Sequence, residues 1–227
     1  MDRTPLSILS RNLQFYGKSR MDKVSKATVL VAGIGGLGCI VSEILTRMGI
    51  KRLIILDNGI IDEPDLGRQS LYTIYDVGRR KVEAAKDRLK SLTGLTEIEP
   101  VFASVSQLEQ KTIDGCDCVV DCLDNFQSRF ELEDRLKEGQ PLVHGGIQND
   151  YGQLTTIIKG KTPGLKEIYA NVKEDGLIAV STPIVFTIAS LMACEVINNI
   201  TGSPQLVGSM LIVELSDFTF TQIELGV

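Results

Sequence analysis

Four closely spaced glycines are followed, within the first 57 residues, by an aspartate. Gly33, Gly35 and Gly38 form the pattern G-x-G-x-x-G, Gly36 lies within it, and Asp57 follows 19 residues after Gly38. Such glycines remove the Cβ atoms that would hold a pyrophosphate away from the backbone, and a helix that begins there offers free N–H groups to an anion. Asp57 is placed to accept hydrogen bonds from ribose hydroxyls. The pattern predicts a nucleotide site, and a tight turn without a ligand is the less favoured interpretation.

Further charged residues suggest which chemistry the nucleotide undergoes. Arg68, Lys81 and Arg11 supply more positive charge than one pyrophosphate bridge requires, but they suit a triphosphate whose α-phosphorus is attacked while pyrophosphate leaves. Asp124 closes an apolar run, where it could bind magnesium or cap the next helix. The only histidine is His144, which leaves a dinucleotide oxidoreductase short of acid/base groups.

The elements that position these residues alternate along the chain as far as residue 150. Apolar runs predict strands at 29–32, 98–103, 118–122 and 141–143 and in a run ending at Asp57, and helices are predicted at about 36–48, 78–92, 107–111 and 126–138. Alternating strands and helices imply a parallel sheet with right-handed crossovers. Residues 144–146, His-Gly-Gly, are expected to form a turn after the strand at 141–143.

The pattern changes after residue 150. Residues 152–158 predict an added antiparallel strand, 159–182 a long loop, and Pro183 the first residue of a helix that runs to about Asn199 and is apolar on almost every face. Strands at 210–214 and 218–223 complete the sheet. The predicted fold class is α/β, a Rossmann-like, mostly parallel sheet flanked by helices with antiparallel strands at the C-terminal end. We expect one domain over 1–227, with an arm at 1–27, a nucleotide-binding part at 28–150 and an antiparallel extension at 151–227.

Composition narrows the function classes. The 227 residues carry a net charge of −5 with a pI of about 5.1, which argues against nucleic acid or an anionic membrane as the main partner. The N-terminus lacks the apolar core of a signal peptide, and no apolar run is expected to reach the ~20 residues of a membrane span. The five cysteines include no C-x-x-C pair, which favours a reducing, cytoplasmic location and a role as small core residues.

Several ordered motifs together resemble one family. They are the glycine pattern with Asp57, DLGRQ at 65–69, GRRKVEAAKDRL at 78–89, DCLDNFQSR at 121–129 and PLVHGG…GQLT at 141–155. Over about residues 9 to 223 the chain resembles the ThiF/MoeB adenylyltransferases and the adenylation domain of ubiquitin-activating enzymes. The resemblance implies that the chain binds ATP and Mg²⁺ and adenylates a carboxylate, commonly the C-terminal glycine of a ubiquitin-like sulphur carrier, with release of pyrophosphate.

The resemblance also implies a role for individual residues. Asp57 would hold the ribose, and Asp124 would bind magnesium within a motif that Asn125 and Arg129 complete. The residues expected to hold the phosphates are Arg68, Gln69 and Lys81. Arg11 stands where the family has an arginine that reaches the partner subunit's ATP, so a homodimer with two composite sites is implied.

Departures from the family pattern bear on the acceptor. Zinc is not expected, because the two C-x-x-C pairs that hold it in many members are absent. The loop at 159–182 has no cysteine for a covalent relay, and Asp65 replaces a usual asparagine, where it would repel ATP unless it binds a metal or meets a cation on the substrate. The sequence therefore predicts adenylation of the carboxylate without a covalent relay through a cysteine.

We favour a small-molecule carboxylate as the acceptor, because the compact C-terminal end lacks the zinc-tied segment that helps dock a carrier protein. Such an acceptor is used by HcgE of methanogens, a similar zinc-free and cysteine-free relative that activates the guanylylpyridinol carboxylate of the iron-hydrogenase cofactor. The alternative acceptor is the glycine tail of a sulphur-carrier protein. His144, Gly145 and Gly146 could line the acceptor pocket, and a core histidine is equally compatible with the sequence. Less favoured functions are an NAD-dependent oxidoreductase and a catalytically silent ATP-binding subunit.

Overall fold

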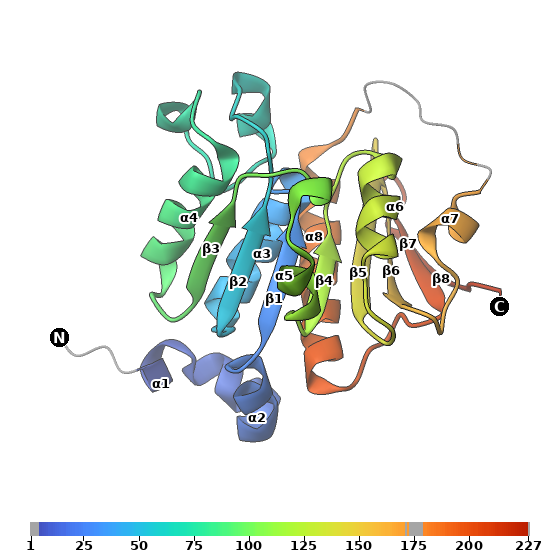
Figure 1. Ribbon diagram of the computed structural model, residues 1–227, viewed down its shortest axis with the longest axis horizontal. Helices are drawn as coiled ribbons and strands as arrows, with labels where there is room; N and C mark the ends of the chain where they lie inside the picture. Colours follow the sequence, from blue (N-terminus) through green and yellow to red (C-terminus); the bar gives the residue numbers. More distant parts are fainter. Residues whose placement is uncertain (1–4, 171, 173–178, 227) are drawn as a thin grey trace.

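One eight-stranded sheet organises the protein, in the order β3-β2-β1-β4-β5-β6-β7-β8 (Figure 1). The computed structural model describes residues 5–170, 172 and 179–226. The strands are β1 (Thr28–Ala32), β2 (Arg52–Leu56), β3 (Glu97–Val101), β4 (Cys118–Asp121), β5 (Pro141–Gln148), β6 (Tyr151–Ile158), β7 (Ser209–Glu214) and β8 (Thr219–Glu224). Strands β1 to β5 pair in parallel, and β6 to β8 continue the sheet antiparallel. The predicted fold class is confirmed.

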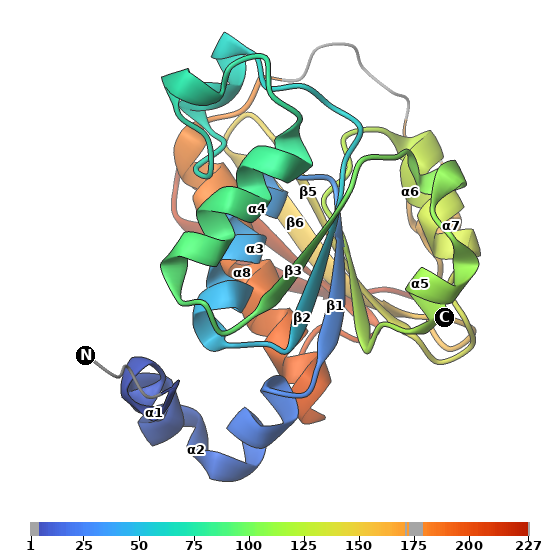
Figure 2. The same ribbon diagram turned by 60° about the vertical axis from the view of Figure 1, so that its left-hand side comes forward.

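Helices cover both faces of the sheet (Figure 2). On one face lie α3 (Gly36–Met48), α4 (Lys81–Leu92) and α8 (Thr182–Thr201), and on the other lie α5 (Gln110–Asp114), α6 (Phe126–Asp134) and α7 (Leu165–Ile168). The central strand β1 is apolar throughout because alternate residues enter the two cores: Val29 and Val31 enter one, and Leu30 and Ala32 the other. Helices α1 (Pro5–Ile8) and α2 (Ser10–Val24) lie at the end of the sheet where β1 begins.

Helix α8 is the apolar helix expected near the C-terminus. It packs against α3, β5 and β6, and ten of its residues are buried, but Phe186 is 43% exposed, so the helix is sandwiched only in part. By length and composition alone it could cross a membrane, with a mean hydropathy of 1.6 over its most apolar window. The expectation that no apolar run reaches that length is therefore wrong. Packing against the sheet explains its composition, as in the core helix of a soluble protein.

The expected turn at His144, Gly145 and Gly146 is wrong. Strand β5 continues through these residues to Gln148 and pairs with β6 along its whole length. Gly145 serves close packing: a Cβ there would lie 2.2 Å from the sulfur of Met192 on α8. Glycine in a strand often marks such an approach rather than a turn.

Several helix boundaries differ from those expected. Helix α4 begins at Lys81 rather than Gly78, because Gly78 has a φ of +85° and Arg80 is extended, in a bridge with Ile60. Helix α6 ends at Asp134, four residues early. The helix expected at 107–111 is replaced by the 3₁₀ turn η3 (Val105–Gln107) and α5, the loop at 159–182 contains α7, and Pro183 is the second residue of α8. Two further 3₁₀ turns, η1 (Glu63–Gly67) and η2 (Ile74–Asp76), lie in the loop after β2.

The buried carboxylate of Glu195 fastens the segment that leads into β7. Its Oε1 accepts hydrogen bonds from the backbone N–H groups of Gln205 (2.8 Å) and Leu206 (2.9 Å), and the residue is 3% exposed. We expect Glu195→Ala to lower the free energy of unfolding by about 2–4 kcal/mol, because two backbone N–H groups, of which that of Leu206 is buried, lose their acceptor. Urea denaturation measures this. The half-buried Glu43, paired with the exposed Arg47, is the control, and Glu43→Ala should cost under about 0.5 kcal/mol; equal effects would contradict the assignment.

Candidate functional site

A large cavity gathers most of the predicted site residues. Its volume is about 1240 Å³, and it begins where β1, β2 and β4 end, at Gly33, Asp57 and Cys122. The helices that follow β1 and β3 cover opposite faces of the sheet, so this is the topological switch point at which open α/β sheets bind ligands. The cavity extends along β5 to β8 beside α6 and α7. Because ligand pockets usually measure ~300–1,000 Å³, there is room for a nucleotide and a second molecule.

Glycine is required at the four positions of the turn for different physical reasons. A Cβ at Gly33, whose φ is +88°, would lie 2.5 Å from the carbonyl oxygen of Cys122, and a Cβ at Gly38 would lie 1.8 Å from that of Gly33. A Cβ at Gly36 would meet Val185 of α8 at 2.9 Å. These three glycines permit close packing. Gly33, Gly35 and Gly36 all line the cavity. Only at Gly35 is the space of the missing Cβ open, with Gln69 Nε2 as its nearest atom at 3.9 Å, so Gly35 is the glycine beside which a phosphate could lie.

Backbone groups fix Asp57 at the end of β2. Its Oδ2 accepts a hydrogen bond from the N–H of Ile34 (2.7 Å) and its Oδ1 accepts one from the N–H of Gly59 (2.6 Å). Each carboxylate oxygen can accept more than one hydrogen bond, so both retain capacity toward the cavity. The geometry therefore allows the predicted contact with a ribose, which stays a prediction.

Asp65 binds the two cations predicted to hold phosphates. Its carboxylate lies 3.2 Å from Lys81 Nζ and 3.5 Å from Arg68 Nη2, and its Oδ1 accepts a hydrogen bond from Gln69 Nε2 at 2.5 Å. The expected counter-ion of Asp65 was a metal or a cation on the substrate, whereas the protein itself supplies two cations. The second hydrogen of Gln69 Nε2 is left for the space beside Gly35. Arg68, Gln69 and Lys81 therefore form one cluster around Asp65, which offsets one of the two positive charges.

Replacing Asp65 with asparagine is expected to strengthen pyrophosphate binding by about tenfold, or ~1.4 kcal/mol, because a negative charge beside Lys81 and Arg68 is removed. Calorimetric titration with pyrophosphate measures the change. Asp87→Asn is the matched control, since the exposed Asp87 pairs with Arg79 outside the cavity. Unchanged or weaker binding in Asp65→Asn would show that Asp65 organises the cations rather than weakening their attraction for phosphate.

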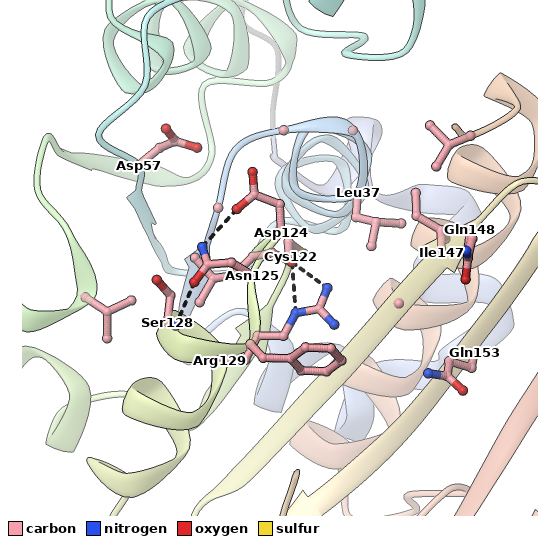
Figure 3. A pocket seen from close by; sticks show the side chains of 18 of the residues that line it. Leu37, Asp57, Cys122, Asp124, Asn125, Ser128, Arg129, Ile147, Gln148 and Gln153 are labelled. Carbon is pink, nitrogen blue, oxygen red and sulfur yellow. Dashed lines mark hydrogen bonds between the residues drawn. The ribbon is translucent and has the colours of Figure 1, made fainter. Parts of the chain in front are cut away.

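Asp124 and Asn125 follow β4 at the centre of the cavity (Figure 3). The interpretation of Asp124 as a helix cap is wrong, because Asn125 is the N-cap of α6: its Oδ1 accepts a hydrogen bond from the N–H of Ser128 at 2.9 Å. Asn125 also donates to Asp124 Oδ1 at 3.1 Å. Asp124 is exposed, so its carboxylate is available to a ligand.

The donor set fits magnesium. Mg²⁺ commonly takes one or two carboxylates together with phosphate oxygens and water, and Asp124 supplies one exposed carboxylate in the same cavity as Arg68 and Lys81. Among the residues that the structure describes, no group of three or more His, Cys, Asp or Glu is placed to hold a metal ion by itself. Phosphate oxygens and water would supply the other ligands.

His144 is a core residue and does not line the cavity. It is 0% exposed; its Nδ1 lies 2.7 Å from Asp121 Oδ2 and its Nε2 lies 2.8 Å from the hydroxyl of Tyr169. Of the three residues at 144–146, Gly146 borders the cavity, opposite Gln153 of β6. Each of the two interpretations left open by the sequence therefore holds for one residue: His144 is a core histidine, and Gly146 lines the cavity.

Arg11 is not brought to the cavity of its own chain. It is an exposed residue of α2, and that helix lies at the end of the sheet where β1 begins, whereas the cavity opens at the end where the parallel strands finish (Figure 1). Its predicted role requires a partner subunit and stays a prediction.

The cavity also contains residues that the sequence analysis did not single out. Tyr151 and Gln153 enter it from β6 and Tyr169 from the segment after α7, and Met210 and Ile212 add an apolar wall from β7. Strand alternation could have placed Gln153 on one face of β6. Tyr169 lies in the long loop, where sequence periodicity gave no signal.

Comparison with known proteins identifies the family. The ThiF family profile matches residues 9–226. The chain belongs to the ThiF family. It is 29% identical to the SAMP-activating enzyme E1 of Haloferax volcanii, over 97% of this chain and 85% of that protein, and 31% identical to the heterocyst protein HesA of Trichormus variabilis, over 96% and 85%. It is 28% identical to the sulfur carrier protein ThiS adenylyltransferase of Bacillus subtilis, over 82% and 58%.

Two solved structures have a similar fold. E. coli MccB with ATP superimposes with a TM-score of 0.78 at 24% identity, covering 96% of this chain and 72% of that one. PaaA superimposes with a TM-score of 0.79 at 22% identity, covering 99% and 75%. At these identities the structures establish the shared fold.

Proposed function

We propose that this ThiF-family adenylyltransferase transfers AMP from ATP to a carboxylate. The observation that carries the proposal is the continuous cavity, which has cationic side chains at one end and an amide and apolar wall at the other. Gly35, Arg68, Lys81 and Asp124 border the first part, and Gln153 lies in the second. Relatives that are adenylyltransferases, and a similar fold determined with ATP, support ATP as the nucleotide.

In the proposed reaction an oxygen of the acceptor carboxylate attacks the α-phosphorus of ATP. A new P–O bond forms, the bond from the α-phosphorus to the bridging oxygen breaks, and pyrophosphate leaves with the electron pair. Arg68 and Lys81 would stabilise the charge that develops on the leaving group, because fixed cations in a partly closed site act without reorganisation. Magnesium held by Asp124 would neutralise phosphate charge.

The charge balance of the cavity supports additional cations. Its charged lining residues are three acids and three bases, namely Asp57, Asp65, Asp124, Arg68, Lys81 and Arg129, so the lining is neutral overall. A triphosphate brings about four negative charges, which a neutral site does not compensate. Mg²⁺ and Arg11 from a partner subunit would supply positive charge, and we therefore propose a homodimer with composite sites.

For the acceptor we propose a small-molecule carboxylate, such as the guanylylpyridinol precursor of the iron-hydrogenase cofactor. The acceptor end of the cavity combines the apolar side chains of Met210, Ile212 and Ile223 with the hydroxyl of Tyr151 and the amide of Gln153, a lining suited to a partly apolar molecule with a few polar groups. The free thiols of all five cysteines fit the proposed cytoplasmic location.

The C-terminal glycine of a ubiquitin-like sulphur carrier is the second candidate. Relatives named for the carriers SAMP and ThiS favour it. An extended glycine tail could also occupy the long cavity beside β6 and β7. The two acceptors share the same chemistry at the α-phosphorus and differ only in what fills the rest of the cavity.

ATP–pyrophosphate exchange tests the function. We expect exchange that requires Mg²⁺ and is stimulated by guanylylpyridinol carboxylate or by a carrier protein ending in Gly-Gly. Exchange with neither acceptor would contradict the proposal. ATP binding without exchange would indicate a silent subunit, and tight NADH binding without magnesium would indicate an oxidoreductase.

A further inference from the structure

A buried chain of hydrogen bonds leads from the core of the sheet to the acceptor end of the cavity. Asp121 ends β4, His144 lies beside it on β5, and Tyr169 follows α7; the Asp121–His144 contact is 2.7 Å and the His144–Tyr169 contact is 2.8 Å. The hydroxyl of Tyr169 also accepts a hydrogen bond from Nε2 of Gln153, 2.6 Å away on β6. The proposed reaction uses none of the three buried groups.

The protonation states of Asp121, His144 and Tyr169 fix which group donates and which accepts in each of these hydrogen bonds. Burial favours the neutral form of Asp121, but Arg129 and the hydrogen bond from His144 outweigh it and hold the pKa of the carboxyl below its usual value. Burial lowers the pKa of His144, so the neutral ring donates from Nδ1 to the ionised Asp121. Its Nε2 is then an acceptor. Burial raises the pKa of Tyr169, so the hydroxyl stays protonated and donates a hydrogen bond to Nε2.

Tyr169 can then only accept from Gln153, which fixes the orientation of that amide. The hydroxyl of Tyr151 donates to Gln153 Oε1 at 3.1 Å and supports the same orientation. One hydrogen on Gln153 Nε2 is left, and this nitrogen borders a notch above Gly146. A Cβ on Gly146 would fill the notch, lying 3.5 Å from Gln153 Nε2 and 3.7 Å from Arg129 Nη1.

Arg129 provides the second donor at the notch. Its Nε and Nη2 both donate to the carbonyl oxygen of Leu123, at 3.0 and 2.5 Å, and Nη1 is engaged by no recorded hydrogen bond within the described part of the chain. The guanidinium side chain is 13% exposed. Gln153 and Arg129 thus present two N–H groups to one small space (Figure 3).

We propose that Asp121, His144 and Tyr169 are positioning residues that hold the Gln153 amide so that it and Arg129 bind a carbonyl or carboxylate oxygen of the acceptor above Gly146. The inference rests on the proposed function, because it assigns the acceptor to this end of the cavity. It names a role for the sole histidine although that histidine touches no ligand.

Protonation of His144 should reverse the donor and acceptor roles in the hydrogen bonds that run from His144 through Tyr169 to Gln153. A proton on Nε2 would make the ring a donor, so Tyr169 would accept from it and donate to Gln153, and the amide would have to turn its oxygen toward Tyr169. The charged groups that act on His144 are Asp121 on β4 and Arg129 on α6, while Tyr169 and Gln153 are neutral. Because burial holds the pKa of His144 below its ordinary value, the functional arrangement is present at neutral pH and is lost as the pH falls through that pKa.

Nitrogen NMR tests the chain independently of catalysis. Protein labelled with ¹⁵N in histidine has one imidazole, so no assignment is needed. At pH 7 we expect the proton on Nδ1, and Tyr169→Phe should shift the Nε2 resonance while the proton stays on Nδ1. A proton on Nε2 at pH 7, or an Nε2 resonance unchanged in Tyr169→Phe, would overturn the proposal.

Exchange kinetics test the role toward the acceptor, using guanylylpyridinol carboxylate and the Gly-Gly carrier protein as probes. We expect Tyr169→Phe to raise the KM of the active acceptor about tenfold with the KM of ATP unchanged, whereas Tyr75→Phe, at an exposed tyrosine outside the cavity, changes neither. His144→Gln removes the group that titrates, so the rise in the acceptor KM that protonation of His144 should cause at low pH is expected to be absent in this variant.

An unchanged acceptor KM in Tyr169→Phe, or an equal rise in the KM of ATP, would overturn the positioning role. If His144→Gln fails to fold, the comparison of Tyr169→Phe with Tyr75→Phe still decides. If the unaltered protein catalyses exchange with neither probe, the proposed function fails. The NMR result alone then decides whether the hydrogen bonds at His144 and Tyr169 have the donors and acceptors proposed here.

Discussion

Replacing Arg68 with alanine is expected to lower the rate of ATP–pyrophosphate exchange by about 10²-fold or more. Arg68 borders the cavity, and its Nη1 donates to the carbonyl oxygen of Pro64 at 2.9 Å, which aims the guanidinium beside Asp65. Loss of this cation removes stabilisation from the leaving pyrophosphate, and it also leaves Asp65 balanced by Lys81 alone. Removal of one electrostatic anchor commonly costs this much.

Arg79→Ala is the control for this variant. Arg79 lies in the same loop region but pairs with Asp76 and Asp87 outside the cavity, so its loss should leave the exchange rate within about twofold, as expected for an exposed ion pair. Urea denaturation of both variants shows whether the fold is intact. A near-normal exchange rate in a folded Arg68→Ala protein would remove Arg68 from the mechanism.

Asp124→Ala should lower exchange by a similar factor, about 10² or more, through the loss of a carboxylate that would hold magnesium. Asn125 caps α6, so the helix keeps its N-terminal hydrogen bond and the variant should fold. Asp124→Asn keeps the size of the side chain and removes its charge. It should be nearly as impaired as Asp124→Ala if the role is electrostatic.

The magnesium dependence of the Asp124 variants gives a second measurement. The concentration of Mg²⁺ at half-maximal exchange should rise in both, whereas Asp134→Ala, at the exposed end of the same helix, should leave it unchanged. Exchange that responds to Mg²⁺ identically in Asp124→Ala and the unaltered protein would assign the metal to other ligands.

The fold could be predicted because its signals are local. Alternating apolar strands and helices indicate a parallel sheet. Each strand contributes to the cores on both faces of this sheet: in β1, Val29 enters one core and Leu30 the other. The sequence could not locate the end of β5, because Gly145 reads as a turn residue until Met192 of α8 is seen to lie against it. Such a contact joins residues 47 positions apart, beyond the reach of any local pattern.

The candidate site was predictable only on its nucleotide side. Gly35, Asp57 and Asp124 each lie within three residues of the end of a strand, and the ends of parallel strands meet at one edge of the sheet. The pairing of Asp65 with Lys81 needed the folded loop, because the two residues are 16 positions apart: Asp65 lies in the 3₁₀ turn η1, and η2 separates it from Lys81. The acceptor side is built from antiparallel strands and the segment after α7, whose residues no spacing rule connects.

The most direct test of the central claim is ATP–pyrophosphate exchange measured with and without a carboxylate acceptor. The account predicts that exchange in the presence of Mg²⁺ rises many-fold when guanylylpyridinol carboxylate or a carrier protein ending in Gly-Gly is added, and that Arg68→Ala abolishes the rise. Exchange that neither acceptor stimulates would contradict carboxylate adenylation.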